Sequence, residues 1–171
     1  MKKLLVIVDM QNDFIDGALG SEEAVKIVPN VKAKIEGFEG RIIYTRDTHQ
    51  ENYLETQEGT NLPVKHCIEG TDGWQIKDCL TTGDMVVFDK VTFGSVELGT
   101  YLKECAEKED IESITFIGLC TDICVISNAM LTKAFLPEVK LIVDSKCCAG
   151  VSVETHNNAL NAMKVCQIEI I

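Results

Sequence analysis

The chain has 171 residues, of which 46% are hydrophobic, and it carries a formal net charge of −11. A chain of this length and apolar content can bury a core of its own, and we expect one domain over residues 1–171. The excess of negative charge disfavours nucleic acid and anionic membranes as partners, because their phosphate groups would be repelled. No apolar run approaches the ~20 residues of a membrane-spanning helix.

The amino-terminal apolar run resembles a signal peptide only faintly, because it ends at Asp9 after five residues, and we interpret it as a strand. Eight cysteines are present, but no Cys-x-x-Cys spacing occurs. A zinc knuckle and a thioredoxin-like redox motif are therefore disfavoured. We expect reduced thiols and a cytoplasmic location.

Six short runs, most of them apolar on both faces, are typical of the strands of a parallel sheet covered on both sides. They are Leu4–Asp9, Arg41–Asp47, Met85–Lys90, Ile114–Leu119, Leu141–Ser145 and Cys166–Ile171.

Apolar residues at helical spacing separate these runs and predict four helices. The segments run over residues 28–35, 98–106, 125–134 and 153–164, and Pro29 is expected to lie near a first turn. Strands alternating with helices predict an α/β fold, a doubly wound, Rossmann-like sheet of six parallel strands with helices on both faces. The one long irregular segment, residues 47–73, is of a length that is usually functional.

Polar side chains close several of the predicted strands. Ligands of an open parallel sheet bind beyond the carboxyl ends of its strands, where the strand order reverses. In the order 3-2-1-4-5-6, the first and fourth strands are neighbours at that point. Asp9 ends the first strand, Lys90 the third, and Cys120 to Cys124 follow the fourth. We therefore expect an acid, an amine and a thiol to converge there.

This combination suits nucleophilic catalysis by a thiol. The pKa of a thiol falls at a helix start or beside a cation, and Cys124 is predicted in a first helical turn capped by Thr121 or Asp122. Asp9 could take the thiol proton and Lys90 could supply positive charge. The alternatives are ordinary ones: a core cysteine, a loop-capping aspartate and a solvated lysine.

Three motifs, "IVDMQNDF", "FDKVTFGS" and "GLCTDICV", together resemble the isochorismatase-like cysteine hydrolases, and the resemblance runs along essentially the whole chain. It implies a catalytic triad of Asp9, Lys90 and Cys124. It also implies a cis peptide at Leu119–Cys120 and an oxyanion hole formed by the N–H groups of Cys120 and Cys124. Phe14 matches a position that packs on the substrate ring.

Two further motifs, "RDTH" and "KHCIEGTDGW", are similar to those of nicotinamidases within that family. The similarity implies a metal site formed by Asp47, His49 and His66. Such ligands suit zinc, with manganese or iron as alternatives. Glu55 or Glu58 could add a ligand, and the alternative is a pair of solvated loop histidines.

The resemblance implies a cysteine amidohydrolase, with nicotinamidase as the leading hypothesis and a homo-oligomer as the expected assembly. An N-carbamoylsarcosine amidase-like hydrolase is the nearest alternative. Isochorismatase proper is disfavoured by the presence of Cys124. A non-catalytic binding protein on the same fold remains open, as does a redox role if Cys120 and Cys124 could bridge. The role of Trp74 is not predicted, and His156 is expected to be structural and remote from the strand ends.

Overall fold

The computed structural model describes residues 1–171 and contains one sheet of six parallel strands in the order β3-β2-β1-β4-β5-β6. Both the predicted sheet and its strand order are confirmed, with β1 and β4 neighbours at the point where the order reverses. The strands are β1 (Lys2–Val8), β2 (Arg41–Asp47), β3 (Val86–Lys90), β4 (Ile111–Leu119), β5 (Lys140–Ala149) and β6 (Glu169–Ile170).

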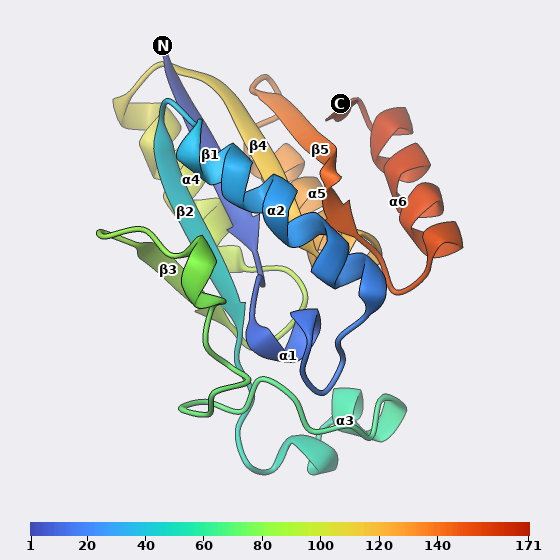
Figure 1. Cartoon of the computed structure of the whole chain (residues 1–171). Helices are drawn as coiled ribbons and strands as arrows, with labels where there is room; N and C mark the ends of the chain where they lie inside the picture. The colour runs from blue at the N-terminus through green and yellow to red at the C-terminus, as the bar shows by residue number, and fades with distance from the viewer.

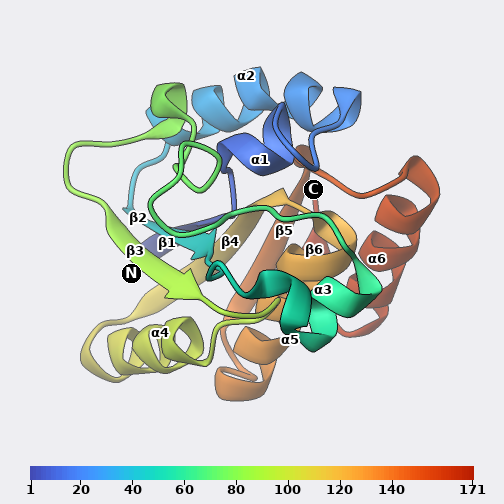
Figure 2. The same cartoon turned by 90° about the horizontal axis from the view of Figure 1, so that it is seen from below.

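Helices cover both faces of this sheet (Figures 1 and 2). On one face lie α1 (Asn12–Ile15) and α2 (Glu22–Glu36). On the other lie α4 (Val96–Lys108), α5 (Ile126–Phe135) and α6 (Val153–Val165). At the carboxyl edge of the sheet, the short helix α3 (Gln57–Asn61) follows a 3-10 turn, η1 (Tyr53–Glu55). Two further turns are η2 (Asp78–Leu80) and η3 (Thr121–Val125). None of the helices has the length and the apolar content that a membrane span requires.

The core has two halves because successive side chains of a strand point to opposite faces. In β1, Leu4, Val6 and Val8 pack on the side of α4 and α5, while Leu5 and Ile7 pack on the side of α2. All five are fully buried. Burying both faces of the central strands fixes the register, since a slip by one residue would exchange the two halves.

Helix α2 is longer than the sequence predicts. It begins after Ser21, whose side chain accepts a hydrogen bond from the Ala24 N–H, so Pro29 lies in its middle and not near its first turn. The proline removes one backbone donor. The residue four positions earlier, Val25, is 48% exposed. Water can therefore reach the side of the helix where the bond is missing.

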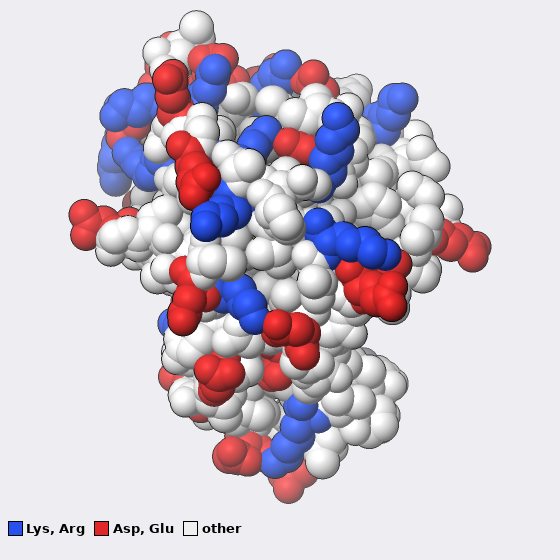
Figure 3. All heavy atoms as spheres, viewed as in Figure 1, with Lys and Arg blue, Asp and Glu red and all other residues white.

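The charged surface mixes both signs despite the net charge, as Figure 3 shows for one face.

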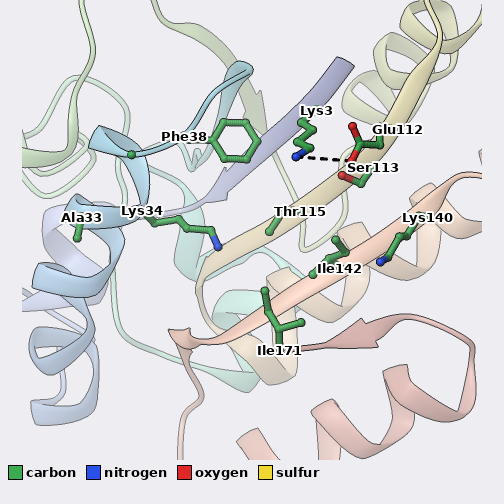
Figure 4. Close-up of a pocket in the computed structure, with 11 residues that line it drawn as sticks. Lys3, Ala33, Lys34, Phe38, Glu112, Ser113, Thr115, Lys140, Ile142 and Ile171 are labelled. Atoms are coloured by element: carbon green, nitrogen blue, oxygen red, sulfur yellow. Dashed lines mark ion pairs between the residues drawn. The ribbon is translucent and has the colours of Figure 1, made fainter. Parts of the chain in front are cut away.

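On the α2 face of the sheet, residues of β1, β4, β5 and α2 line a hollow of about 360 Å³ (Figure 4). Its three lysines each pair with a carboxylate: Lys3 with Glu112 at 3.5 Å, Lys34 with Asp144 at 2.7 Å and Lys140 with Glu169 at 2.6 Å. Asp144 lies in the middle of β5. It precedes an irregularity in the pairing of β5 with β4 and points to α2.

No residue with a side chain fits at Gly118, near the end of β4, without a steric clash. Its φ is +116°, and a Cβ atom there would collide with the Val8 carbonyl oxygen of the adjacent strand.

We expect Gly118→Ala to lower the free energy of unfolding by roughly 2–4 kcal/mol in urea denaturation. Gly83→Ala is the control, since its Cβ meets nothing within 4 Å. Equal stability of the two variants would contradict this account.

Candidate active site

Three side chains from different strands meet at the carboxyl edge of the sheet. Asp9 follows β1, Lys90 ends β3, and Cys124 lies in η3 after β4. The Lys90 Nζ is 2.7 Å from Asp9 Oδ2 and 3.4 Å from Cys124 Sγ. The structure therefore brings together the acid, amine and thiol that the sequence predicts, and all three are buried.

The Asp9 carboxylate is held in place by its neighbour on β2. Thr45 Oγ1 donates to Asp9 Oδ1 at 2.6 Å, and the Asp9 N–H donates to the Thr45 carbonyl at 3.2 Å. Asp9 has a φ of +48°, which turns the chain off the strand. Burial raises the pKa of Asp9, although the Lys90 charge opposes the shift. Apart from its contact with Lys90, Oδ2 has no hydrogen-bond partner, so it can accept a proton.

The segment that carries Cys124 differs from the predicted α-helix start. Residues Thr121–Val125 form a π-helical turn, with the Val125 N–H donating to the Cys120 carbonyl at 3.0 Å. Neither Thr121 nor Asp122 caps it, so that prediction is wrong. The Leu119–Cys120 peptide is cis, as the resemblance implies. The Cys120 N–H donates no hydrogen bond within the protein.

The environment of the Cys124 thiol favours its protonated form. Burial raises its pKa well above the usual range, and the nearby Asp9 charge adds to the shift, while Lys90 opposes it. The expected lowering of this pKa is therefore wrong, because complete burial outweighs the effect of the Lys90 charge. A buried thiol needs a base beside it in order to attack, and Asp9 is in position to be that base.

A single buried amide joins the two segments that carry Lys90 and Cys124. Asn128 Nδ2 donates to the Cys124 carbonyl at 2.8 Å and to the Phe93 carbonyl at 3.0 Å. Its Oδ1 accepts from the Ser95 N–H at 2.9 Å. The loop after β3 is thus held against α5 and against the backbone of Cys124.

A second cluster lies beside this one and shares a residue with it. Asp47, His49, Glu58 and His66 each place a ligand atom within 4.8 Å of the others. Asp47 Oδ1 is also 3.1 Å from the Lys90 Nζ. The structure brings together the three predicted ligands and resolves the choice left open for a fourth. Glu58 of α3 faces the histidines, whereas Glu55 is not in the cluster.

These four residues fit a divalent cation. His66 Nδ1 donates to the Val64 carbonyl at 2.8 Å, which leaves Nε2 with a lone pair facing the cluster. Burial and the Asp47 charge raise the pKa of Glu58, the mark of negative charges crowded together. Burial also acts to raise the pKa of Asp47, but its contacts with His49 and His66 and the Lys90 charge lower it overall. Nitrogen and carboxylate donors in this number suit zinc, manganese or iron.

Aromatic rings pack around the histidines. The Tyr53 ring lies 4.6 Å from His49 and 5.0 Å from His66 between centroids, and it is fully buried. The half-buried Phe14 ring lies 5.4 Å from the His66 ring, beside the cluster. The sequence did not single out Tyr53, although its place in the long irregular segment with both histidines was a usable signal.

Two further residues that the sequence analysis overlooked position Asp47 and His66. Gln11 is fully buried, accepts from the Asp47 N–H at 2.7 Å and donates to the Asp47 carbonyl at 2.8 Å. Asp13 accepts from the Cys67 N–H at 2.7 Å and so holds the residue that follows His66. Both belong to the motif "IVDMQNDF", which contains Asp9, and their proximity to Asp9 was the available signal.

Trp74 holds two segments of the site together. Its ring lies 3.7 Å from the Arg46 guanidinium carbon, and its Nε1 donates to Thr48 Oγ1 at 2.9 Å. Its carbonyl accepts from Gln11. These contacts fasten the loop before η2 to the end of β2. The expectation that His156 lies far from the site is wrong, because its Nδ1 is 2.7 Å from the Oγ1 of Thr121 in η3.

Comparisons with known proteins agree with this geometry. Residues 3–171 match the isochorismatase domain family, and the chain belongs to that family. It is 26% identical to the nicotinamidase of Schizosaccharomyces pombe, over 98% of this chain and 91% of that protein. It is 25% identical to the nicotinamidase/pyrazinamidase of Mycobacterium tuberculosis, over 99% and 98% of the two chains. It is a nicotinamidase-like member of the family.

A solved structure extends the likeness to three dimensions. The pyrazinamidase of Pyrococcus horikoshii in complex with zinc has a TM-score of 0.85 to this chain and 27% identity, covering 100% of this chain and 99% of that one. The nicotinamidase/pyrazinamidase of Bacillus subtilis has a TM-score of 0.81 and 25% identity, covering 99% of each chain.

The metal cluster can be tested without any assay of catalysis. Because Glu58 faces the histidines and Glu55 does not, we expect Glu58→Gln to weaken zinc binding by about 10-fold or more, on the scale seen when groups around a metal are altered. The matched variant Glu55→Gln should bind zinc like the wild type. Calorimetric titration of the metal-free protein measures both. Equal affinities for the two variants would remove Glu58 from the ligand set.

Proposed function

We propose that this protein is a cysteine amidohydrolase that converts nicotinamide and water to nicotinate and ammonia. The observation that carries the proposal is the shared position of Lys90, which joins the thiol and its base to the metal cluster through Asp47. A thiol site alone would suit many amides. The adjoining cluster and the Phe14 ring favour a substrate with a flat ring that carries both a carboxamide and a ring nitrogen able to bind a metal ion.

In the proposed reaction, Asp9 takes the Cys124 proton as the sulfur attacks the amide carbonyl carbon. The carbonyl oxygen becomes an oxyanion, which the N–H groups of Cys120 and Cys124 stabilise. Asp9 then returns the proton to the departing nitrogen, and ammonia leaves as a thioester forms. Asp9 next takes a proton from water as the water oxygen attacks the thioester carbon. The C–S bond then breaks, the proton returns to the Cys124 sulfur, and nicotinic acid leaves and loses its own proton to solvent to become nicotinate.

Lys90 remains charged throughout. Burial acts against its charge, but Asp9, Cys124 and Asp47 outweigh this and raise its pKa well above the usual range. The ammonium therefore stabilises the negative charge as it moves between the carboxylate and the sulfur. A cation held by Asp47, His49, Glu58 and His66 would supply a Lewis acid that anchors the ring nitrogen of the substrate.

The proposal predicts unequal roles for two nearby cysteines. Cys124→Ala removes the attacking atom, so ammonia release from nicotinamide should fall by about 10³-fold or more. Cys120→Ala keeps the backbone N–H, so its rate should stay within about fivefold of the wild type. Ammonia release by the zinc-loaded protein, with and without a chelator, measures both.

Two results would contradict parts of the proposal. A Cys124→Ala variant with wild-type turnover would exclude this thiol as the nucleophile. No ammonia from the zinc-loaded wild type would exclude nicotinamide as the substrate, while the family assignment would stand. Parallel assays with N-carbamoylsarcosine would then test the nearest alternative.

A further inference from the structure

The π-helical turn η3 is fastened to the segment that leads into α6. Thr121 Oγ1 lies 2.7 Å from His156 Nδ1. The Asp122 carboxylate oxygens lie 3.1 and 3.2 Å from the Val151 nitrogen, which donates to them. Gly150 allows this close packing, because a Cβ atom there would lie 2.9 Å from the Cβ of His156. The outer side of the turn is therefore tied to α6, while its inner side faces Lys90.

Thr121 is placed to act through the backbone of the turn. It is fully buried, and its hydroxyl group is directed to α6, where His156 is the one hydrogen-bond partner of its side chain. It directly follows Cys120 and lies three residues before Cys124. A π turn is an uncommon conformation that departs from the α-helical hydrogen-bond pattern. Contacts from outside the turn therefore have a large share in setting its shape.

We propose that the Thr121–His156 contact is a latch that sets the position of Cys124 and of the Cys120 N–H relative to Lys90 and Asp9. Both members are positioning residues. The inference rests on the proposed function in one respect, the role of Cys124 as the nucleophile. Since neither side chain has to touch the substrate, loosening the latch should lower kcat and leave KM almost unchanged.

Four variants separate the hydrogen bond from the packing. Thr121→Val and His156→Leu remove the bond and keep a side chain of similar bulk. Thr121→Ser keeps the hydroxyl, and His156→Asn keeps a polar atom near the position of Nδ1. For ammonia release from nicotinamide, we expect kcat to fall about 10-fold or more in the first pair, with KM within about twofold. The second pair should recover most of the rate, and the double variant Thr121→Val with His156→Leu should be no slower than either single variant.

A second readout does not need turnover of nicotinamide. The rate at which iodoacetamide alkylates Cys124, followed by mass spectrometry of its peptide, reports directly on the position and reactivity of the thiol. We expect this rate to fall in Thr121→Val and His156→Leu and to recover in Thr121→Ser and His156→Asn. If the wild type does not hydrolyse nicotinamide, the proposed function fails, but the alkylation rates still decide whether the latch exists.

Thr155→Val is the matched control on the same helix. Thr155 shares the capping box of α6 with Ser152, and its side chain makes no hydrogen bond to η3, so its loss should lower the melting temperature and spare kcat. The latch is overturned if Thr121→Val and His156→Leu keep wild-type kcat and alkylation rates. It is also overturned if Thr155→Val is as slow as they are, or if the polar replacements recover nothing.

Discussion

The buried ammonium group of Lys90 is the interaction on which the whole site depends. It lies 2.7 Å from the Asp9 carboxylate, 3.1 Å from that of Asp47 and 3.4 Å from the Cys124 sulfur. A charge removed from water must be paired, and an unpaired buried carboxylate is equally costly. The three residues around Lys90 lie directly after β1, at the end of β2 and in the turn after β4, so the strand order 3-2-1-4 is what allows the pairing. The thiol and the metal cluster are thus two parts of one electrostatic unit.

Much of this arrangement could be predicted from the sequence. The strand runs are apolar on both faces, and parallel strands end at a common edge, so Asp9, Asp47 and Lys90 had to lie near one another. The fourth member of the cluster could not be chosen in this way. Glu55 and Glu58 lie in the same irregular segment, and only the folded turn of α3, where Thr56 accepts a hydrogen bond from the Gly59 N–H, points Glu58 at the histidines.

Other features depend on partners that are distant in the sequence. Thr121 and Asp122 look like helix caps, because each has a side chain that could bind a nearby N–H group. Their actual partners, His156 and Val151, are 35 and 29 residues away. The pKa of Cys124 is a similar case. Local features favour a thiolate, whereas the depth at which the core buries the sulfur favours the thiol.

The side-chain amide of Asn128 shows how little freedom the chemistry leaves at this edge of the sheet. Two carbonyl groups need its N–H donors and one N–H group needs its oxygen, so all three partners fix which way the amide faces. Aspartate has the same shape but offers only acceptors at neutral pH, and it would set a negative charge against the carbonyl oxygens of Phe93 and Cys124. Leucine would fill the space but would remove the three hydrogen bonds that the amide makes. The position therefore selects for a hydrogen-bonding pattern, and a residue of equal size cannot replace it.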